Sequence, residues 1–245
     1  MLFQWCYNQV KLYVTGIFSH LSTEISPCFW REICIDIEQN TYYIMQRNFM
    51  EAVAVRRSIY HLGAEISASD KQITHIIEFA LRHVPSAFNA QSTRIVLLVR
   101  HHHTLLWDIV KECLQPLLTP ERAERTFAKI DSEFATGHGT ILFYEDTTII
   151  EEQKRAYPPY AERMDTWSEH TSAMHQFMIW TALAALGIGA SLQHYNPLID
   201  ARLATEWGIP SSWRLIAQMP FGNRLSEPAE REQHKPIYER LRVFN

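Results

Sequence analysis

The sequence has little glycine and no pattern of paired cysteines. Its 245 residues include 8 glycines and 4 cysteines, and Cys6, Cys28 and Cys34 all lie in the N-terminal stretch. No CxxC pair and no cysteine–histidine spacing typical of zinc occurs. The motifs GxGxxG, GxxxxGK[ST] and GxSxG are also absent. The specific signals for a Rossmann domain, a P-loop and an α/β-hydrolase are therefore missing.

Long apolar runs and an excess of positive charge are lacking as well. No run approaches the roughly 20 residues that cross a bilayer. The opening "MLFQWCYNQVKLYVTGIFSHL" has neither the basic region nor the cleavage site of a signal peptide. A net charge of -4 and a pI near 6.3 give no broad basic field for nucleic acid or anionic membrane, although a local basic pair could hold one phosphate. We therefore expect a cytoplasmic protein with reduced thiols and small-molecule partners.

The character of the sequence changes near residue 45. Residues 1–44 are rich in cysteine and aromatic residues and show little periodicity, whereas the pattern is regular over 45–245. We expect residues 1–44 to be an N-terminal appendage. Either it is a disordered segment, or translation starts at Met45 or Met50 and the upstream residues come from an over-extended gene prediction. The whole chain is 47% apolar. Residues 45–245 are long enough to form one α+β domain with a full core.

Helices and strands alternate along 45–245, with helices in the majority. Apolar residues at i, i+3, i+4 and i+7 predict an amphipathic helix over 70–84, with Ser69 or Asp70 as N-cap and Pro85 at its end. The segment 167–186 is apolar nearly all round in its second half, so it belongs at a domain centre or a subunit interface. A layered α+β or α/β fold follows. The other expected helices cover 103–114, 120–134 and 197–207, and the expected strands 94–99, 140–146, 190–195 and 213–221.

Two polar motifs are candidates for binding. In "RRSIY", the guanidinium groups of Arg56 and Arg57 and the hydroxyl group of Ser58 can hold one phosphate through charge-assisted hydrogen bonds. The alternative is a solvated helix end. In "PSAFNAQS", the carboxamides of Asn89 and Gln91 offer donor and acceptor groups together, which suits the edge of a heterocycle. The alternative is an ordinary loop in which they cap backbone groups.

A third motif, "GIGASLQHYNPL", follows the apolar segment. Gly187 and Gly189 either cap the preceding helix or let a flat ligand approach the backbone closely. Gln193 and His194 then lie at the end of an expected strand.

Neither a metal site nor a covalent nucleophile is predicted. The three histidines at 101–103 are adjacent, so their side chains do not converge on one face, and no carboxylate lies at ligand spacing. We expect them to form a solvated turn. Cys113 falls on the buried face of its expected helix, which favours a core position over a nucleophile.

Taken in this order, the three motifs resemble the nitroreductase family of flavoproteins. The stretches "VPSAFNAQSTRIVLL", "WSEHTSAMHQFMIWTALAALGIGASLQHYNPLID" and "WRLIAQMPFG" are most similar to the branch of fatty-acid-repression-mutant-type nitroreductases. The resemblance covers roughly residues 50–245. It implies a three-layer α+β fold with a central mixed sheet flanked by helices, and an FMN-binding homodimer. The long apolar helix would build the dimer interface, and the C-terminal tail would extend onto the partner.

The resemblance also implies which residues contact the flavin. The first motif would hold the FMN phosphate, the second would lie at the flavin edge, and the third near the reactive N5, while a basic tail residue would complete the phosphate site. Tyr60 departs from the family pattern, since many members carry Arg or Lys there, facing the N1/O2 side. The expected cofactor-binding residues are Arg56, Arg57, Ser58, Tyr60, Asn89, Gln91, Gln193, His194 and Arg231, with Lys235 as the alternative in the tail.

The activity implied by the resemblance is that of an FMN-dependent NAD(P)H oxidoreductase. A nitroaromatic, quinone or N-oxide would be reduced by ping-pong hydride transfer through flavin N5, with no catalytic side chain and no metal. NAD(P)H would stack on the flavin and needs no dinucleotide domain. Two alternatives from other classes are a flavin-binding sensor or regulatory protein with little turnover, and an interaction module without flavin.

Overall fold

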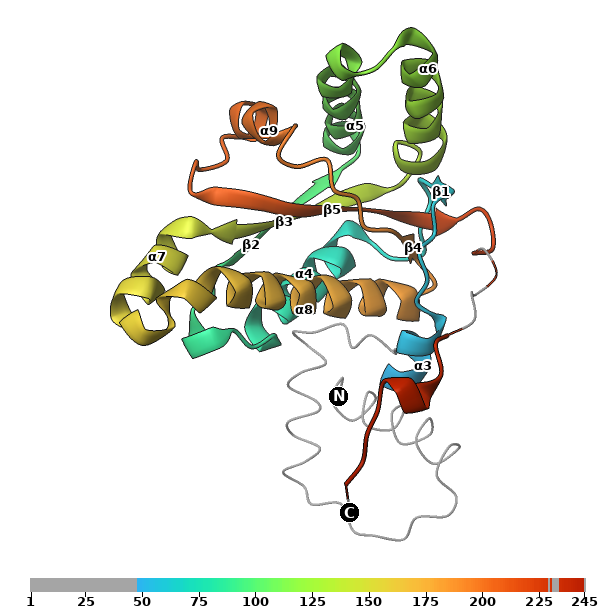
Figure 1. Cartoon of the computed structure of the whole chain (residues 1–245). Helices are drawn as coiled ribbons and strands as arrows, with labels where there is room; N and C mark the ends of the chain where they lie inside the picture. Colours follow the sequence, from blue (N-terminus) through green and yellow to red (C-terminus); the bar gives the residue numbers. More distant parts are fainter. Residues whose placement is uncertain (1–47, 229, 231–233, 245) are drawn as a thin grey trace, which may run out of the picture. The chain divides into compact units, whose positions relative to one another are not determined.

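A sheet of five strands lies at the centre of the computed structural model, which describes residues 48–228, 230 and 234–244 (Figure 1). The strand order is β1-β5-β3-β2, and β4 pairs with β5. We expected a mixed sheet, but the ladders between its strands are all antiparallel. Among the described residues, parallel pairing is confined to a bridge between Ser58 and Ala190. The strands are β1 (Leu62–Gly63), β2 (Thr93–Val99), β3 (Gly139–Asp146), β4 (Gly189–Ala190) and β5 (Trp213–Arg224).

Helices cover both faces of the sheet, which gives the expected α+β arrangement of three layers (Figure 1). One face carries α4 (Asp70–His83) and α8 (Met164–Ala185), and α3 (Phe49–Val55) and α7 (Thr147–Ala156) pack on α8. The other face carries α5 (His101–Leu114), α6 (Pro120–Lys129) and α9 (Asp200–Trp207). Short stretches of 3₁₀-helix, and of π-helix at η3, lie between or after these elements: η1 (Ala87–Asn89), η2 (Gln115–Leu117), η3 (Ile130–Phe134), η4 (Pro158–Arg163) and η5 (Ile237–Glu239).

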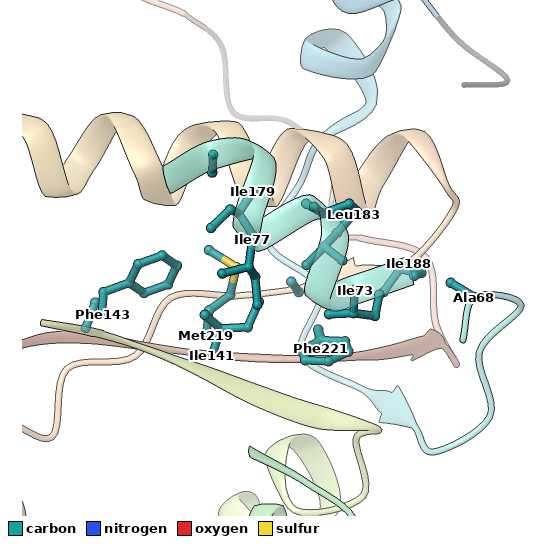
Figure 2. Packing of buried hydrophobic residues seen from close by; sticks show 14 residues of the cluster. Ala68, Ile73, Ile77, Ile141, Phe143, Ile179, Leu183, Ile188, Met219 and Phe221 are labelled. Atoms are coloured by element: carbon teal, nitrogen blue, oxygen red, sulfur yellow. The ribbon is translucent and has the colours of Figure 1, made fainter. Parts of the chain in front are cut away.

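Each face of the sheet has its own core because side chains alternate along β3. Ile141 and Phe143 pack into the cluster formed with α4 and α8, which Figure 2 shows. Leu142 and Tyr144 belong to the cluster formed with α5 and α9. All of β3 is therefore buried, which explains why this segment of the sequence shows an apolar run without alternation.

The sequence signals at α4 agree with its structure. The Ser69 hydroxyl group accepts a hydrogen bond from the Gln72 backbone N–H, and the Gln72 side chain accepts one from the Ser69 backbone N–H. This capping box satisfies donors that the first helical turn leaves unpaired. The helix ends directly before Val84 and Pro85. Its buried residues are the periodic ones, Ile73, Ile76, Ile77 and Ala80.

The expected strand over 190–195 is much shorter than predicted. Only Gly189 and Ala190 form β4, after which Gln193 rejoins β5 through a bridge to Gln218. The Gln218 side chain accepts a hydrogen bond of 2.7 Å from the Tyr195 backbone N–H. A hydrogen bond to a side chain thus takes the place of backbone pairing with β5 at this point. The segment 147–163, for which no element was predicted, contains α7 and η4.

The two glycines after α8 have different roles. Gly187 has a φ of +77°, a left-handed conformation, and no atom lies within 4 Å of the place where a Cβ would stand. The next residue, Ile188, donates its N–H to the Leu183 carbonyl group at 3.0 Å, which closes the helix end. At Gly189, a Cβ would lie 2.9 Å from the side chains of Ile59 and Arg224. Gly187 therefore caps the helix, whereas Gly189 permits close packing of protein against protein.

We expect Gly187→Ala to destabilise the protein by about 1 kcal/mol, because an L side chain is disfavoured in the left-handed region. Urea denaturation followed by circular dichroism measures the change. Gly187→Asn is the matched control and should cost less, since Asn tolerates this conformation. Equal stability of wild type and Gly187→Ala would contradict the cap.

Candidate functional site

An open cavity of about 620 Å³ lies against the basic motif. This volume is within the range of sites that bind small molecules and cofactors. The predicted phosphate-binding residues and Tyr60 therefore share one cavity wall with the start of the C-terminal tail. The lining residues are Arg56, Arg57, Ser58, Ile59, Tyr60, His61, Glu133, Ser226, Glu227 and Pro228.

The basic motif is held beside the turn that follows α8. Ser58 forms the parallel bridge with Ala190, and the Ile59 N–H donates to the Ala190 carbonyl oxygen at 3.0 Å. The Arg56 guanidinium carbon lies 4.3 Å from the centre of the Trp180 ring on α8, within the range of a cation–π contact. The structure thus brings the first and third motifs together, although they are far apart in the sequence.

Gln193 and His194 continue this half of the site along the sheet. Gln193 is three residues beyond Ala190, which in extended chain corresponds to about 10 Å. Its backbone exchanges two hydrogen bonds with Gln218, at 2.7 and 2.9 Å, and its side chain donates to the Ser191 hydroxyl group at 3.1 Å. His194 is exposed. The pair therefore lies on rigid backbone that leads away from the phosphate motif.

The second motif, which we call the carboxamide loop (residues 86–92), has an unusual backbone. Phe88, Asn89 and Gln91 have φ values of 50°, 53° and 51°, a region that costs non-glycine residues about 1–3 kcal/mol each. Asn89 and Gln91 are exposed. Within the part of the chain that the structure describes, neither carboxamide caps a backbone group. This geometry favours the binding interpretation over the ordinary loop.

Within one chain, the carboxamide loop and the cavity lie near opposite ends of α8. Ala87 and Ala90 of the loop line a small pocket of about 10 Å³ together with Trp167 and Thr171, in the first turns of α8. The basic motif contacts Trp180, near the other end of the helix. At a rise of 1.5 Å per residue, roughly 14 to 20 Å of helix separates the two places. The second motif is therefore not brought together with the first and third in a single chain (Figure 1).

A cation that the sequence analysis missed lies beside two residues of the cavity wall, Tyr60 and Glu133. The Lys129 ammonium group on α6 lies 5.7 Å from the centre of the Tyr60 ring and 3.9 Å from the Glu133 carboxylate. On the tail side, Arg224 forms an ion pair of 3.3 Å with Glu227. No sequence motif links α6 to the basic motif. Only the fold places Lys129 beside Tyr60.

The prediction of a solvated histidine turn at 101–103 was wrong for His103. These residues form the first turn of α5, and His103 is buried, with Nδ1 2.9 Å from the Thr140 hydroxyl group. Burial lowers the pKa of His103 to about 4, so the side chain is neutral. Cys113, expected in the core, is partly buried and packs against the core beneath α5, and burial raises the pKa of its thiol.

Some expectations concern residues beyond those described. Arg231 and the appendage over 1–44 lie outside the described residues, whereas Lys235 is described and exposed. Among the described residues, no three His, Cys, Asp or Glu side chains come together as a metal would require. In the same part of the chain, no helix combines the length and the apolar character of a membrane span.

Comparison with known proteins gives three findings. The model of a family described as "Nitroreductase family" matches residues 53–223. The chain is 32% identical over 189 residues to nitroreductase FRM2 of Saccharomyces cerevisiae, which covers 75% of this chain and 92% of the relative. Solved structures of nitroreductase CinD from Lactococcus lactis cover 81% of this chain and 100% of their own. The complex with nicotinic acid has 37% identity and a TM-score of 0.75, and that with 4-nitrophenol has 34% and 0.72.

More distant structures share the fold. A nitroreductase with bound FMN from Desulfitobacterium hafniense is 16% identical, with a TM-score of 0.59, and covers 81% of this chain and 100% of its own. At this identity the likeness concerns the arrangement of helices and strands.

Proposed function

Because the chain belongs to the nitroreductase family, we propose that it is an FMN-dependent oxidoreductase that uses NAD(P)H to reduce a nitroaromatic, quinone or N-oxide. One observation carries the proposal. The basic motif lines a cavity of about 620 Å³ and is joined through Ala190 to the segment that contains Gln193 and His194. The cavity wall thus offers groups suited to a phosphate, and the backbone bonded to it leads to a segment suited to the flavin ring.

The chemistry of this wall fits FMN. Arg56 and Arg57 supply positive charge and directional donors for the phosphate, and the Ser58 hydroxyl group adds a further donor. The sheet holds the backbone of Gln193 rigid, so this segment can support the flavin ring in a fixed place. When bound, FMN would supply the redox chemistry that carries a hydride from NAD(P)H to the acceptor. The protein orients the ring and controls access to it.

The site is completed by a second copy of the chain. The outer side of α8 exposes Met174 (40%) and Phe177 (41%), and α4 exposes Phe79 (46%). Such an apolar face on one side of a domain fits a subunit interface. Two copies packed in opposite directions along α8 would bring the carboxamide loop of each chain to the cavity of the other. Each homodimer then has two shared flavin sites, with the exposed tail extending onto the partner.

An aromatic cluster beside the carboxamide loop supports a flat acceptor. Phe88 stacks on Tyr157, with ring centres 4.1 Å apart and planes inclined by 16°. The rings of Tyr160 and Trp167 lie 5.7 and 6.0 Å from that of Phe88 and 5.8 Å from each other. Phe88 and Tyr160 remain partly exposed. Aromatic faces bind flat rings by stacking, and nicotinic acid and 4-nitrophenol, the ligands of CinD, are rings of this kind.

An anaerobic visible spectrum tests the function. We expect FMN-supplemented protein to show the bands of bound oxidised flavin, to bleach with NADH or NADPH, and to recover its colour when 4-nitrophenol or a quinone is added. Bound flavin that does not bleach would favour a sensor or regulatory protein. Protein that stays colourless after supplementation would contradict the flavin assignment itself.

A further inference from the structure

A carboxylate is buried behind the carboxamide loop. Glu145 lies on β3 with no exposed surface, directly opposite Thr93 of β2. Burial raises the pKa of its carboxyl group, while its hydrogen bonds and the charges of Arg94 and Arg214 act in the opposite direction. Removing a carboxylate from water is costly unless its oxygens are well bonded. A buried glutamate at this place in a sheet therefore calls for a physical reason.

Both carboxylate oxygens are used by the end of the loop. The Ser92 hydroxyl group donates to Oε2 at 2.5 Å, and the Thr93 hydroxyl group donates to Oε1 at 2.6 Å. Consecutive side chains of a regular strand point to opposite faces. One carboxylate can bind both hydroxyl groups only if the backbone turns between Ser92 and Thr93. Glu145 therefore joins both side chains at the point where the loop becomes β2.

The backbone directly before Ser92 is strained. Three loop residues have positive φ values without being glycine, so the loop relaxes unless its ends are held. At the first end, the Ser86 hydroxyl group accepts from the Gln91 N–H at 3.0 Å. At the other end, the Asp146 N–H donates to the Ser92 carbonyl oxygen at 2.9 Å. Glu145 adds two short hydrogen bonds at this same end, from Ser92 and Thr93.

We propose that Glu145 is a positioning residue of the flavin site: its buried carboxylate holds Ser92 and Thr93 so that the Asn89 and Gln91 carboxamides project outward toward the flavin. The inference rests on the proposed function. Glu145 touches neither flavin nor substrate in this scheme. It acts through the loop, and hence on the flavin bound by the partner chain.

The test compares FMN affinity with stability. We expect Glu145→Ala to raise the dissociation constant for FMN about tenfold, and Ser92→Ala, which removes one of the two bonds, about threefold. Glu145→Gln should stay within about twofold, because its amide group still accepts from one hydroxyl group and can donate to the other. Flavin fluorescence titration measures each constant at a temperature at which every variant is folded by circular dichroism.

Thr140→Val is the matched control. Thr140 lies on the same strand, is equally buried, and bonds to His103 at 2.9 Å and Trp107 at 3.2 Å, away from the carboxamide loop. We expect this variant to lower the melting temperature and leave FMN affinity unchanged. If Glu145 only stabilised the fold, Glu145→Ala would likewise lower the melting temperature and leave FMN affinity unchanged.

The outcomes separate the inference from the function on which it rests. Wild-type protein that does not bind FMN would reject the proposed function. Wild-type binding with unchanged affinity in both Glu145→Ala and Ser92→Ala would overturn only the positioning role. If Glu145→Ala does not fold, Ser92→Ala alone decides, with about threefold weaker binding expected and unchanged binding overturning the inference. A Glu145→Gln variant as weak as Glu145→Ala would also overturn it, because charge rather than hydrogen bonding would then matter.

Discussion

Arg56→Ala is expected to weaken FMN binding by roughly 10- to 150-fold, which corresponds to about 1.5–3 kcal/mol for hydrogen bonds to a charged group. Arg56 lines the cavity, and its guanidinium group lies over Trp180, so its direction is fixed before a ligand binds. Little side-chain entropy is then lost on binding the phosphate. Flavin fluorescence titration of the purified apoprotein measures the loss.

Two further variants show whether the loss comes from the phosphate contact. Arg82→Ala removes the same charge from the exposed surface of α4, where Arg82 pairs only loosely with Glu78 at 3.8 Å, and should leave FMN affinity unchanged. Arg56→Lys keeps the charge but not the fork of donors, so an intermediate affinity is expected. Unchanged flavin retention in Arg56→Ala would contradict the assignment of the phosphate site.

If the chain forms the proposed homodimer, Phe177→Asp is expected to abolish it and, with it, FMN binding. Phe177 lies on the exposed apolar face of α8, and a carboxylate placed in a buried subunit interface has no partner there. In the proposed arrangement each flavin site needs the carboxamide loop of the other chain, so the monomer should have two incomplete half-sites. Analytical ultracentrifugation and FMN titration of the same sample measure the two losses together.

The matched control for this change is Leu117→Asp. Leu117 is also an exposed apolar residue, but it belongs to η2, which follows α5 on the other face of the sheet. This variant should remain a dimer and bind FMN normally. A monomeric Phe177→Asp protein with full FMN affinity would show that a single chain contains the whole site.

Mixed dimers test the shared site without disturbing the interface. Chains with Arg56→Ala lack the phosphate contact, and chains with Asn89→Ala and Gln91→Ala lack both carboxamides. Each protein alone should bind FMN weakly. After unfolding and refolding in an equal mixture, about a quarter of the sites should recover wild-type affinity, because only mixed dimers contain one intact site. No recovery would contradict the exchange of loops between subunits.

The sequence predicted local structure better than it predicted which residues far apart in the sequence lie together. The capping box at α4 and the fully buried β3 follow from the residues themselves. By contrast, α7 was missed because 147–156 has only a weak apolar pattern, although Asp146 accepts from the Thr148 N–H as its N-cap. The short β4 could not be foreseen either, since the Gln218 side chain, which is distant in sequence, takes over the pairing.

The candidate site shows the same division. The basic motif lines a cavity, as its residue types suggested, but the sequence does not show that the carboxamide loop lies near the far end of α8. The left-handed backbone at Phe88 and Asn89 was also unforeseen, because such residues rarely adopt it. No sequence motif pointed to Lys129 or Glu145. Both become visible only through neighbours that the fold brings together.

The position of β5 in the sheet has a consequence for how the protein is made. β5 pairs with β1, β3 and β4, yet it ends at Arg224 in a chain of 245 residues. While the ribosome is still synthesising the chain, β3 has an unpaired edge, and such an edge readily joins other chains. Nascent protein should therefore need chaperones until β5 has left the ribosome. Truncation before residue 213 should give an aggregate rather than a smaller domain, with no wall on which the flavin pocket could form.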